Sequence, residues 1–88
     1  MAYRLFDLRS VWRAEARFTA TGSVGLEVVN TDDTRLYYVV TDSDTLPAIP
    51  LFRAGRVHSG EAKPVGLTDG ERLWLASETD RGNATVNY

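Results

Sequence analysis

The residues best suited to chemistry in this chain are His58, Ser59 and Glu61, which lie within four positions of one another. A histidine, a hydroxyl and a carboxylate are the groups of a nucleophilic site, but catalysis requires them to converge in space around one reacting atom. Here they are near neighbours in one strand-like stretch, and the chain has a single histidine. We therefore expect His58 to be a surface strand residue, and we expect no catalytic residues and no enzymatic activity.

Two acidic pairs, Asp32 with Asp33 and Asp42 with Asp44, offer the oxygen ligands that calcium prefers. They flank the two ends of one apolar stretch and cannot share an ion without help from other loops, so we interpret them as solvated turns. The chain has no cysteine, which excludes disulfides and thiolate metal sites. The sequence therefore predicts neither a metal nor a cofactor.

The elements that would position these groups are β-strands. Apolar residues alternate from Arg13 to Ala20, through Val24 to Asn30, and again towards the carboxyl end, with turns at Thr68-Asp69-Gly70 and Asp80-Arg81-Gly82-Asn83. Such alternation between turn residues is typical of half-buried antiparallel strands. The pattern predicts an all-β domain over residues 13–88, a small antiparallel β-sandwich or squashed barrel of about seven strands. Residues 1–12 are predicted to form an N-terminal arm in an extended conformation.

Two stretches are apolar on both faces, Leu36 to Val40 and Leu73 to Ala76. A sandwich covers only one face of each strand, so something else must cover the other. The candidates are the N-terminal arm, residues 46–52 and a partner subunit. Because Pro47 and Pro50 cannot donate ladder hydrogen bonds, we interpret residues 46–52 as an extended crossover between the two sheets.

Size and charge limit the classes of function. A chain of 88 residues buries only about 60–65% of its unfolded surface, so its core is marginal and association would stabilise it. The net charge of −2 argues against a dedicated nucleic-acid-binding protein. No apolar run approaches the roughly 20 residues that span a bilayer, and the first residues lack the order of a secretory signal. We expect synthesis in the cytoplasm and no membrane contact.

The N-terminal arm is rich in apolar and cationic side chains. It either caps the sandwich or docks on another subunit, and aromatic and arginine residues are the usual anchors of protein interfaces. On that basis the predicted interface residues are Tyr3, Arg4, Phe6, Arg9, Trp12, Tyr37 and Phe52. Exposed aromatic residues could instead stack on sugar rings, and one of the adjacent Tyr37 and Tyr38 would be free for that role.

The order of these elements resembles small structural proteins of tailed bacteriophages. The shared pieces are Val24 to Asn30 (V-x-L-x-V-x-N), Leu36 to Asp42, the proline-bearing Leu46 to Phe52, Gly60-Glu61, Leu67 to Leu75 with its Gly-Glu-x-Leu-Trp-Leu end, and Ala84 to Tyr88. The resemblance implies a non-enzymatic virion protein, a head decoration or cement subunit, assembled in the host cytoplasm. Its partner would be the major capsid protein or another virion protein, bound as a homo-oligomer or in many copies. The alternative is a tail or surface module that recognises host glycan or receptor.

Overall fold

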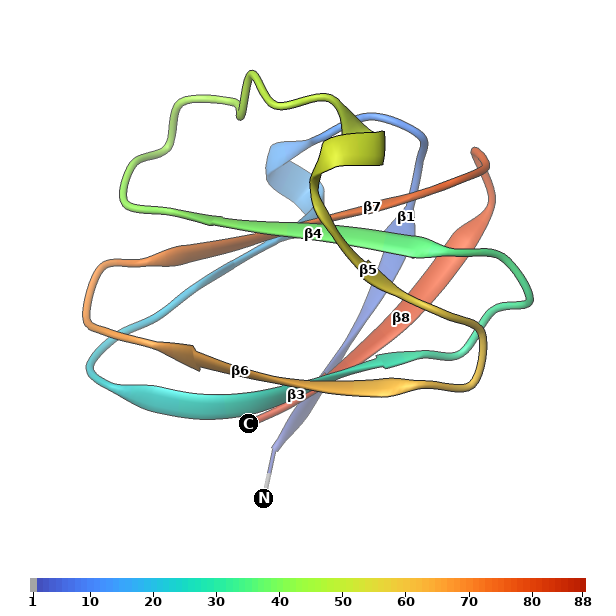
Figure 1. The fold of residues 1–88 in the computed structure, drawn as a ribbon. Coiled ribbons are helices and arrows are strands. Elements are labelled where there is room, and N and C mark those ends of the chain that lie inside the picture. Colours follow the sequence, from blue (N-terminus) through green and yellow to red (C-terminus); the bar gives the residue numbers. More distant parts are fainter. Residues whose placement is uncertain (1) are drawn as a thin grey trace.

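The computed structural model of the chain describes residues 2–88. Eight strands in these residues form two four-stranded antiparallel sheets, which pack face to face (Figure 1). The first sheet has the order β1-β8-β3-β6, and the second has the order β2-β7-β4-β5. The strands are β1 (Tyr3–Leu8), β2 (Arg17–Thr19), β3 (Val24–Asn30), β4 (Leu36–Thr41), β5 (Gly55–Val57), β6 (Ala62–Leu67), β7 (Arg72–Ser77) and β8 (Gly82–Asn87). The predicted small antiparallel β-sandwich is confirmed.

Local chemistry fixes the turns between the strands. In the turn from β6 to β7, Gly70 has φ of +85°, a conformation that glycine adopts without strain. The Glu71 side chain closes this turn by accepting hydrogen bonds from the backbone N–H and the hydroxyl of Thr68, at 2.7 and 3.0 Å. The predicted turn at Thr68 to Gly70 is therefore present, and it carries the chain from the first sheet to the second.

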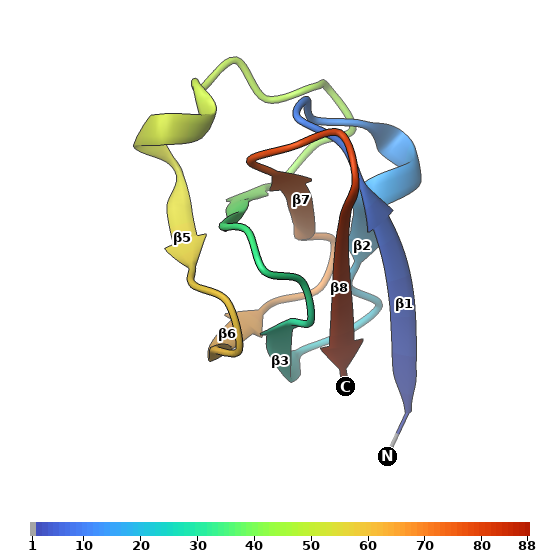
Figure 2. The same cartoon turned by 90° about the vertical axis from the view of Figure 1, so that its right-hand side faces the viewer.

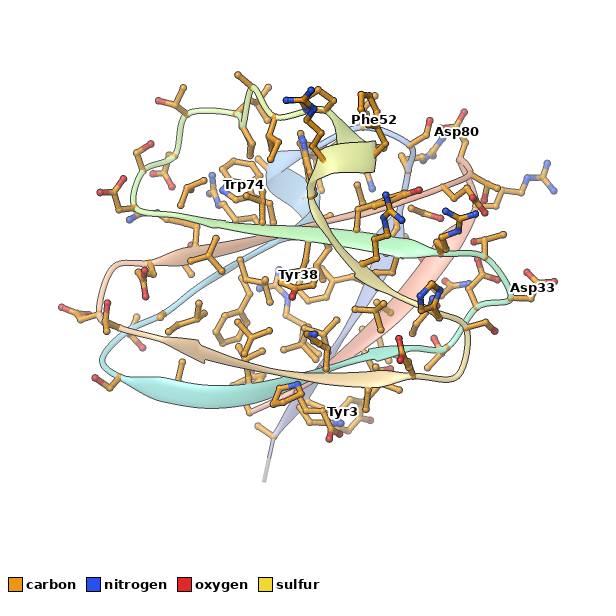
Figure 3. The ribbon with its side chains drawn as sticks, viewed as in Figure 1. Tyr3, Asp33, Tyr38, Phe52, Trp74 and Asp80 are labelled. Carbon is orange, nitrogen blue, oxygen red and sulfur yellow. The ribbon has the colours of Figure 1, made fainter. Side chains whose placement is uncertain are left out.

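Inward-pointing residues of both sheets make the core. Leu26 and Val28 of β3, Leu73 and Leu75 of β7 and Val86 of β8 are each at most 4% exposed and belong to one cluster. The alternation read from the sequence thus places the expected residues inside. Tyr38 also points between the sheets (Figure 3) and packs against this cluster.

The N-terminal residues do not form a separate arm. Tyr3–Leu8 are extended, as predicted, but as β1 they pair along their whole length with β8 at one edge of the first sheet (Figure 2). Phe6 and Leu8 are buried in the core, at 3% and 2% exposure. The predicted division into residues 1–12 and 13–88 therefore does not match the structure. The sequence of β1 did not reveal this, because its partner β8 lies at the other end of the chain.

A second difference concerns residues 14–16. The alternation predicted one strand from Arg13 to Ala20, but Ala14–Ala16 form a short 3-10 helix, η1, in which the Ala16 N–H donates to the Arg13 carbonyl. Strand β2 then runs only from Arg17 to Thr19. Of the four residues that the alternation places on one face, Ala16, Phe18 and Ala20 are buried as predicted, and Ala14 is exposed.

The prediction that residues 46–52 cross between the two sheets is wrong. They belong to a longer connection, residues 42–54, that stays with the second sheet. This connection joins β4 to β5, which are antiparallel neighbours in the second sheet, and it contains the 3-10 helix η2 (Leu51–Arg53). Figure 1 shows this stretch arching beyond β4 and β7, on the side away from the first sheet. We call residues 42–54 the covering segment.

The covering segment answers the question of what covers the second apolar face. Trp74 points away from the core cluster, yet it is 0% exposed, and Figure 3 shows it between β4 and the covering segment. Its indole N–H donates to the Thr41 hydroxyl at 2.7 Å. A second tryptophan, Trp12, donates to the Ile49 carbonyl at 2.9 Å and so joins the residues after β1 to the covering segment. The chain itself covers this face without a partner subunit.

Charged groups hold the start of the covering segment on the second sheet. Asp44 lies 2.9 Å from Arg72 and 3.2 Å from Arg17, and Arg72 also donates to the Asp42 carbonyl. The hydrogen bond from Arg72 and the positive charge of Arg17 lower the pKa of the Asp44 carboxyl below its ordinary value of 3.8. The Arg17 guanidinium also stacks on Trp74, 5.2 Å from the ring centroid.

Candidate functional site: the outer face of the first sheet

Within residues 2–88, no segment covers the outer face of the first sheet. In antiparallel pairs, opposite residues share a face, so the strand register identifies which side chains point outward. We call this surface the bare face, and its positions are Tyr3, Leu5, Asp7, Gly25, Glu27, Val29, Ala62, Pro64, Gly66, Asn83, Thr85 and Asn87. Figure 3 shows Tyr3 beyond the first sheet, on the side opposite Trp74.

An uncharged stripe crosses the bare face over all four strands. Leu5 on β1 lies opposite Thr85 on β8, Thr85 opposite Val29 on β3, and Val29 opposite Ala62 on β6. Leu5 is 69% exposed, and Tyr3 beside it on the same strand is 67% exposed. These are large apolar side chains in water on the flat surface of a sheet, where a partner could bury them.

Charge on the bare face has one sign only. Asp7 and Glu27 are its two charged residues, and both are exposed carboxylates. A shallow hollow of about 310 Å³ lies beside the stripe, lined by Gly25, Leu26, Glu27, Asn87 and Tyr88. A partner surface that fits this face would be largely apolar and would place arginine or lysine opposite the carboxylates.

The seven predicted interface residues do not form one surface. Tyr3 lies on the bare face, and Phe52, which is 64% exposed, lies on η2 of the covering segment, beyond the opposite sheet (Figure 3). Two are buried within the chain, Phe6 at 3% and Tyr37 at 7% exposure. Trp12 is half-buried against the covering segment.

The two predicted interface arginines also lie apart. Arg4 stacks on Phe6, with its guanidinium carbon 4.7 Å from the ring centroid. Arg9 follows β1 at the other end of the strand, where its carbonyl accepts a hydrogen bond from the Ser77 N–H. Residue type alone selected aromatic and arginine residues, most of them near the chain start, and it missed Leu5, Val29 and Thr85. The signal that could have found them is the alternation within each strand, which shows which residues point outward. It would have to be combined for three strands that are far apart in the sequence but paired in the sheet.

The tyrosine pair considered for sugar stacking is not available for it. Tyr37 points outward from the second sheet but is 7% exposed, and Tyr38 points into the core. Neither ring presents the open face that a sugar would need. The structure therefore offers no observation that favours glycan recognition through this pair.

The groups suited to chemistry serve the turns. The Ser59 hydroxyl donates to the Asp32 carbonyl at 2.7 Å, and the Glu61 carboxylate accepts a hydrogen bond from the His58 backbone N–H at 2.8 Å. The first bond holds the turn between β5 and β6 against the loop after β3, and the second closes that turn itself. Within residues 2–88, no three histidine, cysteine, aspartate or glutamate side chains come together as a metal site would require.

A buried asparagine holds the same end of the sandwich. The Asn30 side-chain amide donates to the carbonyls of Thr34 and Val57, at 2.6 and 2.9 Å, and its oxygen accepts from the Asp32 N–H. These bonds satisfy a side chain that is 1% exposed. Asn30 is therefore a structural residue that joins β3, its following loop and β5.

The fold and the site together define the class of protein: a small antiparallel β-sandwich with one outer face covered by its own chain and the other bare. Comparison with protein-family models, with curated proteins and with solved structures found no match. Among residues 2–88, no helix has the length and apolarity needed to span a membrane.

Proposed function

We propose that this protein is a non-enzymatic accessory subunit that docks through its bare face on the repeating surface of a larger protein assembly. The observation that carries the proposal is the contrast between its two outer faces. The chain uses residues 42–54 to cover the second sheet and leaves Tyr3 and Leu5 in water on the first. Exposed apolar surface on a sheet is a liability for a free monomer and is a common mark of an interaction site.

The size of the bare face favours binding in many copies. Four strands of about six residues present a surface of roughly 19 by 20 Å, or about 400 Å². A specific interface buries about 800 Å² on each partner, so one copy alone would bind weakly. A repeating partner surface overcomes this limit, because many weak contacts hold a layer of subunits in place. Decoration of a shell is a function of this kind.

The specific form of the proposal is a capsid decoration or cement subunit of a tailed bacteriophage, bound to the major capsid protein or another virion protein. The resemblance to small phage structural proteins supports it. Its shared pieces correspond to β3, β4, the covering segment, the β6 to β7 turn and β8. These elements build much of the core and part of the bare face, whereas β1, which carries Tyr3 and Leu5, lies outside the resemblance.

The test is binding to particles with one residue changed on the stripe. Thr85 lies in the middle of the bare face, and Thr85→Lys adds a charge there without entering the core. Thr21→Lys is the matched control, since Thr21 is exposed in the turn between β2 and β3. Each variant is mixed with particles of the phage that the gene-carrying cells produce, after this protein has been removed from the particles. The particles are then sedimented.

We expect the wild-type chain and Thr21→Lys to sediment with the particles in many copies, and Thr85→Lys to remain in the supernatant while keeping its β-sheet circular dichroism. Particles that carry the protein should also release their contents at a higher temperature, since a ligand stabilises the state it binds. A wild-type chain that never sediments with particles would refute the proposed function. Equal binding by Thr85→Lys would refute the assignment to the bare face.

A further inference from the structure

The four edge strands of the two sheets differ in how well they are protected. An edge strand exposes unpaired backbone groups that can pair with another chain, and proteins block this with short strands, proline or lysine. Strands β2 and β5 are three residues long, and β6 contains Lys63 and Pro64. Strand β1 has six residues and contains neither proline nor lysine, and its charged residues are Arg4 and Asp7. Figure 2 shows it as the last strand of the first sheet, with β8 on its inner side.

The backbone groups at the free edge of β1 can be assigned from the register. Ala2 and Tyr88 exchange two hydrogen bonds of 2.9 Å, so the alternating residues Arg4, Phe6 and Leu8 also bond to β8. The N–H and C=O groups of Tyr3, Leu5 and Asp7 then point away from the sheet. One of these groups is already used, because the Asp7 carbonyl accepts a hydrogen bond from Arg13 at 2.8 Å.

We propose that β1 pairs antiparallel with β1 of a second copy of this chain, with Leu5 opposite Leu5 across a two-fold axis. This register joins the two Leu5 residues by reciprocal N–H to C=O bonds. It also lets each Asp7 N–H bond to the Tyr3 carbonyl of the other copy. Four backbone hydrogen bonds form, and none of them needs the Asp7 carbonyl that Arg13 occupies.

Side chains favour this register over its neighbour. With Leu5 opposite Leu5, each Tyr3 phenol lies beside the Asp7 carboxylate of the other copy, and each Arg4 lies opposite Phe6, the ring on which arginine already stacks within the chain. If one strand slides by two residues, so that Tyr3 of one copy lies opposite Leu5 of the other, Arg4 lies opposite Arg4. Like charges directly across a strand pair are destabilising, so charge disfavours this shifted register.

The dimer would join the two first sheets edge to edge, with both bare faces on the same side. If the proposed docking function holds, a dimer offers about 800 Å² to the partner, the size typical of one side of a specific interface. Dimerisation itself does not depend on that function, since it rests only on the edge of β1. Its test therefore uses the isolated protein, and the particle experiment remains separate.

Sedimentation velocity and amide hydrogen exchange by NMR, both over a range of protein concentrations, test the pairing. We expect the mass to double at high concentration, and the exchange of the Leu5 and Asp7 amides to slow in parallel. The Tyr3 amide should keep exchanging, because its acceptor, the Asp7 carbonyl, is taken by Arg13. The Arg4 and Phe6 amides bond to β8 and should be protected at every concentration.

Two variants break the pairing in different ways. Leu5→Pro removes an N–H that the monomer does not use, which an edge strand tolerates, and Leu5→Lys places two ammonium groups opposite each other. Both should stay monomeric, whereas Leu5→Ala keeps the backbone donor and should still dimerise. A wild-type chain that stays monomeric with a freely exchanging Leu5 amide would overturn the proposal. So would a dimer that survives Leu5→Lys and is lost in Thr85→Lys, because that dimer would form through the bare face.

Discussion

Replacing Trp74 by alanine tests the contrast between the two faces most directly. Trp74 points away from the core, on the outer side of the second sheet, and is nevertheless 0% exposed. It donates a hydrogen bond to Thr41 and carries Arg17 on its ring. If the covering segment seals this face, Trp74 behaves as a core residue even though it lies outside the sandwich.

The expected cost follows from its complete burial. Truncating a buried tryptophan to alanine lowers the free energy of unfolding by about 3–5 kcal/mol. At 0.05–0.15 kcal/mol per residue, a chain of 88 residues has a total stability of about 4–13 kcal/mol. Trp74→Ala should therefore remove a large part of it. Tyr3→Ala, on the bare face, should change the stability by less than about 0.5 kcal/mol in the isolated monomer.

Urea unfolding followed by far-ultraviolet circular dichroism measures both costs on one scale. A further cycle with Trp74→Phe and Thr41→Val isolates the indole hydrogen bond, whose coupling should be about 1 kcal/mol. The result that refutes the reasoning is a Trp74→Ala cost no larger than that of Tyr3→Ala. The covering segment would then not seal the second sheet, and the contrast that supports docking through the first sheet would be lost.

Two other predictions concern close packing and acid sensitivity. Gly82→Ala should cost about 1–3 kcal/mol, because its new Cβ would lie 2.3 Å from Cβ of Ser77, whereas at Gly25 a new Cβ meets nothing within 4 Å. Asp44 and Asp80 have a lower pKa in the folded protein than their ordinary 3.8, so the stability they add is present above about pH 4 and is lost as the pH falls through their folded values.

The controls for these predictions are direct. Gly25→Ala should be neutral by the same urea assay, and equal costs at Gly25 and Gly82 would contradict the packing argument. For acid sensitivity, the lowered pKa of Asp80 comes from two hydrogen bonds that Ser10 donates, and that of Asp44 from Arg72 and Arg17. A variant with Asp44→Asn and Asp80→Asn should show a flatter fall in stability below about pH 4. An unchanged pH profile would exclude these two carboxyls as its source.

Sequence reasoning worked where the structure depends on neighbours in the chain. The turn at Thr68 to Gly70 and the alternation of β3 and β8 are local properties, and they were enough to identify the sandwich. Whether β1 belongs to the sandwich depends on its pairing with β8 at the opposite end of the chain, and no local sequence pattern indicates that pairing. The stretch Ala14–Ala16 alternates like a strand, yet its backbone turns to form η1. The alternation of apolar residues alone therefore could not distinguish a strand from a short 3-10 helix here.

The candidate site was harder to predict than the fold for the same reason. A sheet face collects side chains from strands that are distant in sequence, as Leu5, Thr85 and Val29 are here. Composition pointed instead to the aromatic residues near the chain start, of which Phe6 is a core residue. A residue type can indicate an interface, but only the register shows which residues share a surface.

The covering segment explains why one face is bare and the other is not. Strands β4 and β5 are antiparallel neighbours that a loop of about two to five residues could join, yet residues 42–54 lie between them. A longer loop costs little extra closure entropy, and its two prolines keep it out of the sheet, so it lies across Trp74 instead. In the described part of the chain, no two consecutive strands lie in the first sheet, so it has no loop of this kind to return across its outer face. The exposure of Tyr3 and Leu5 is therefore not a general consequence of small size, because the same chain covers Trp74 and Tyr37 on its second sheet, where it has the loop to do so.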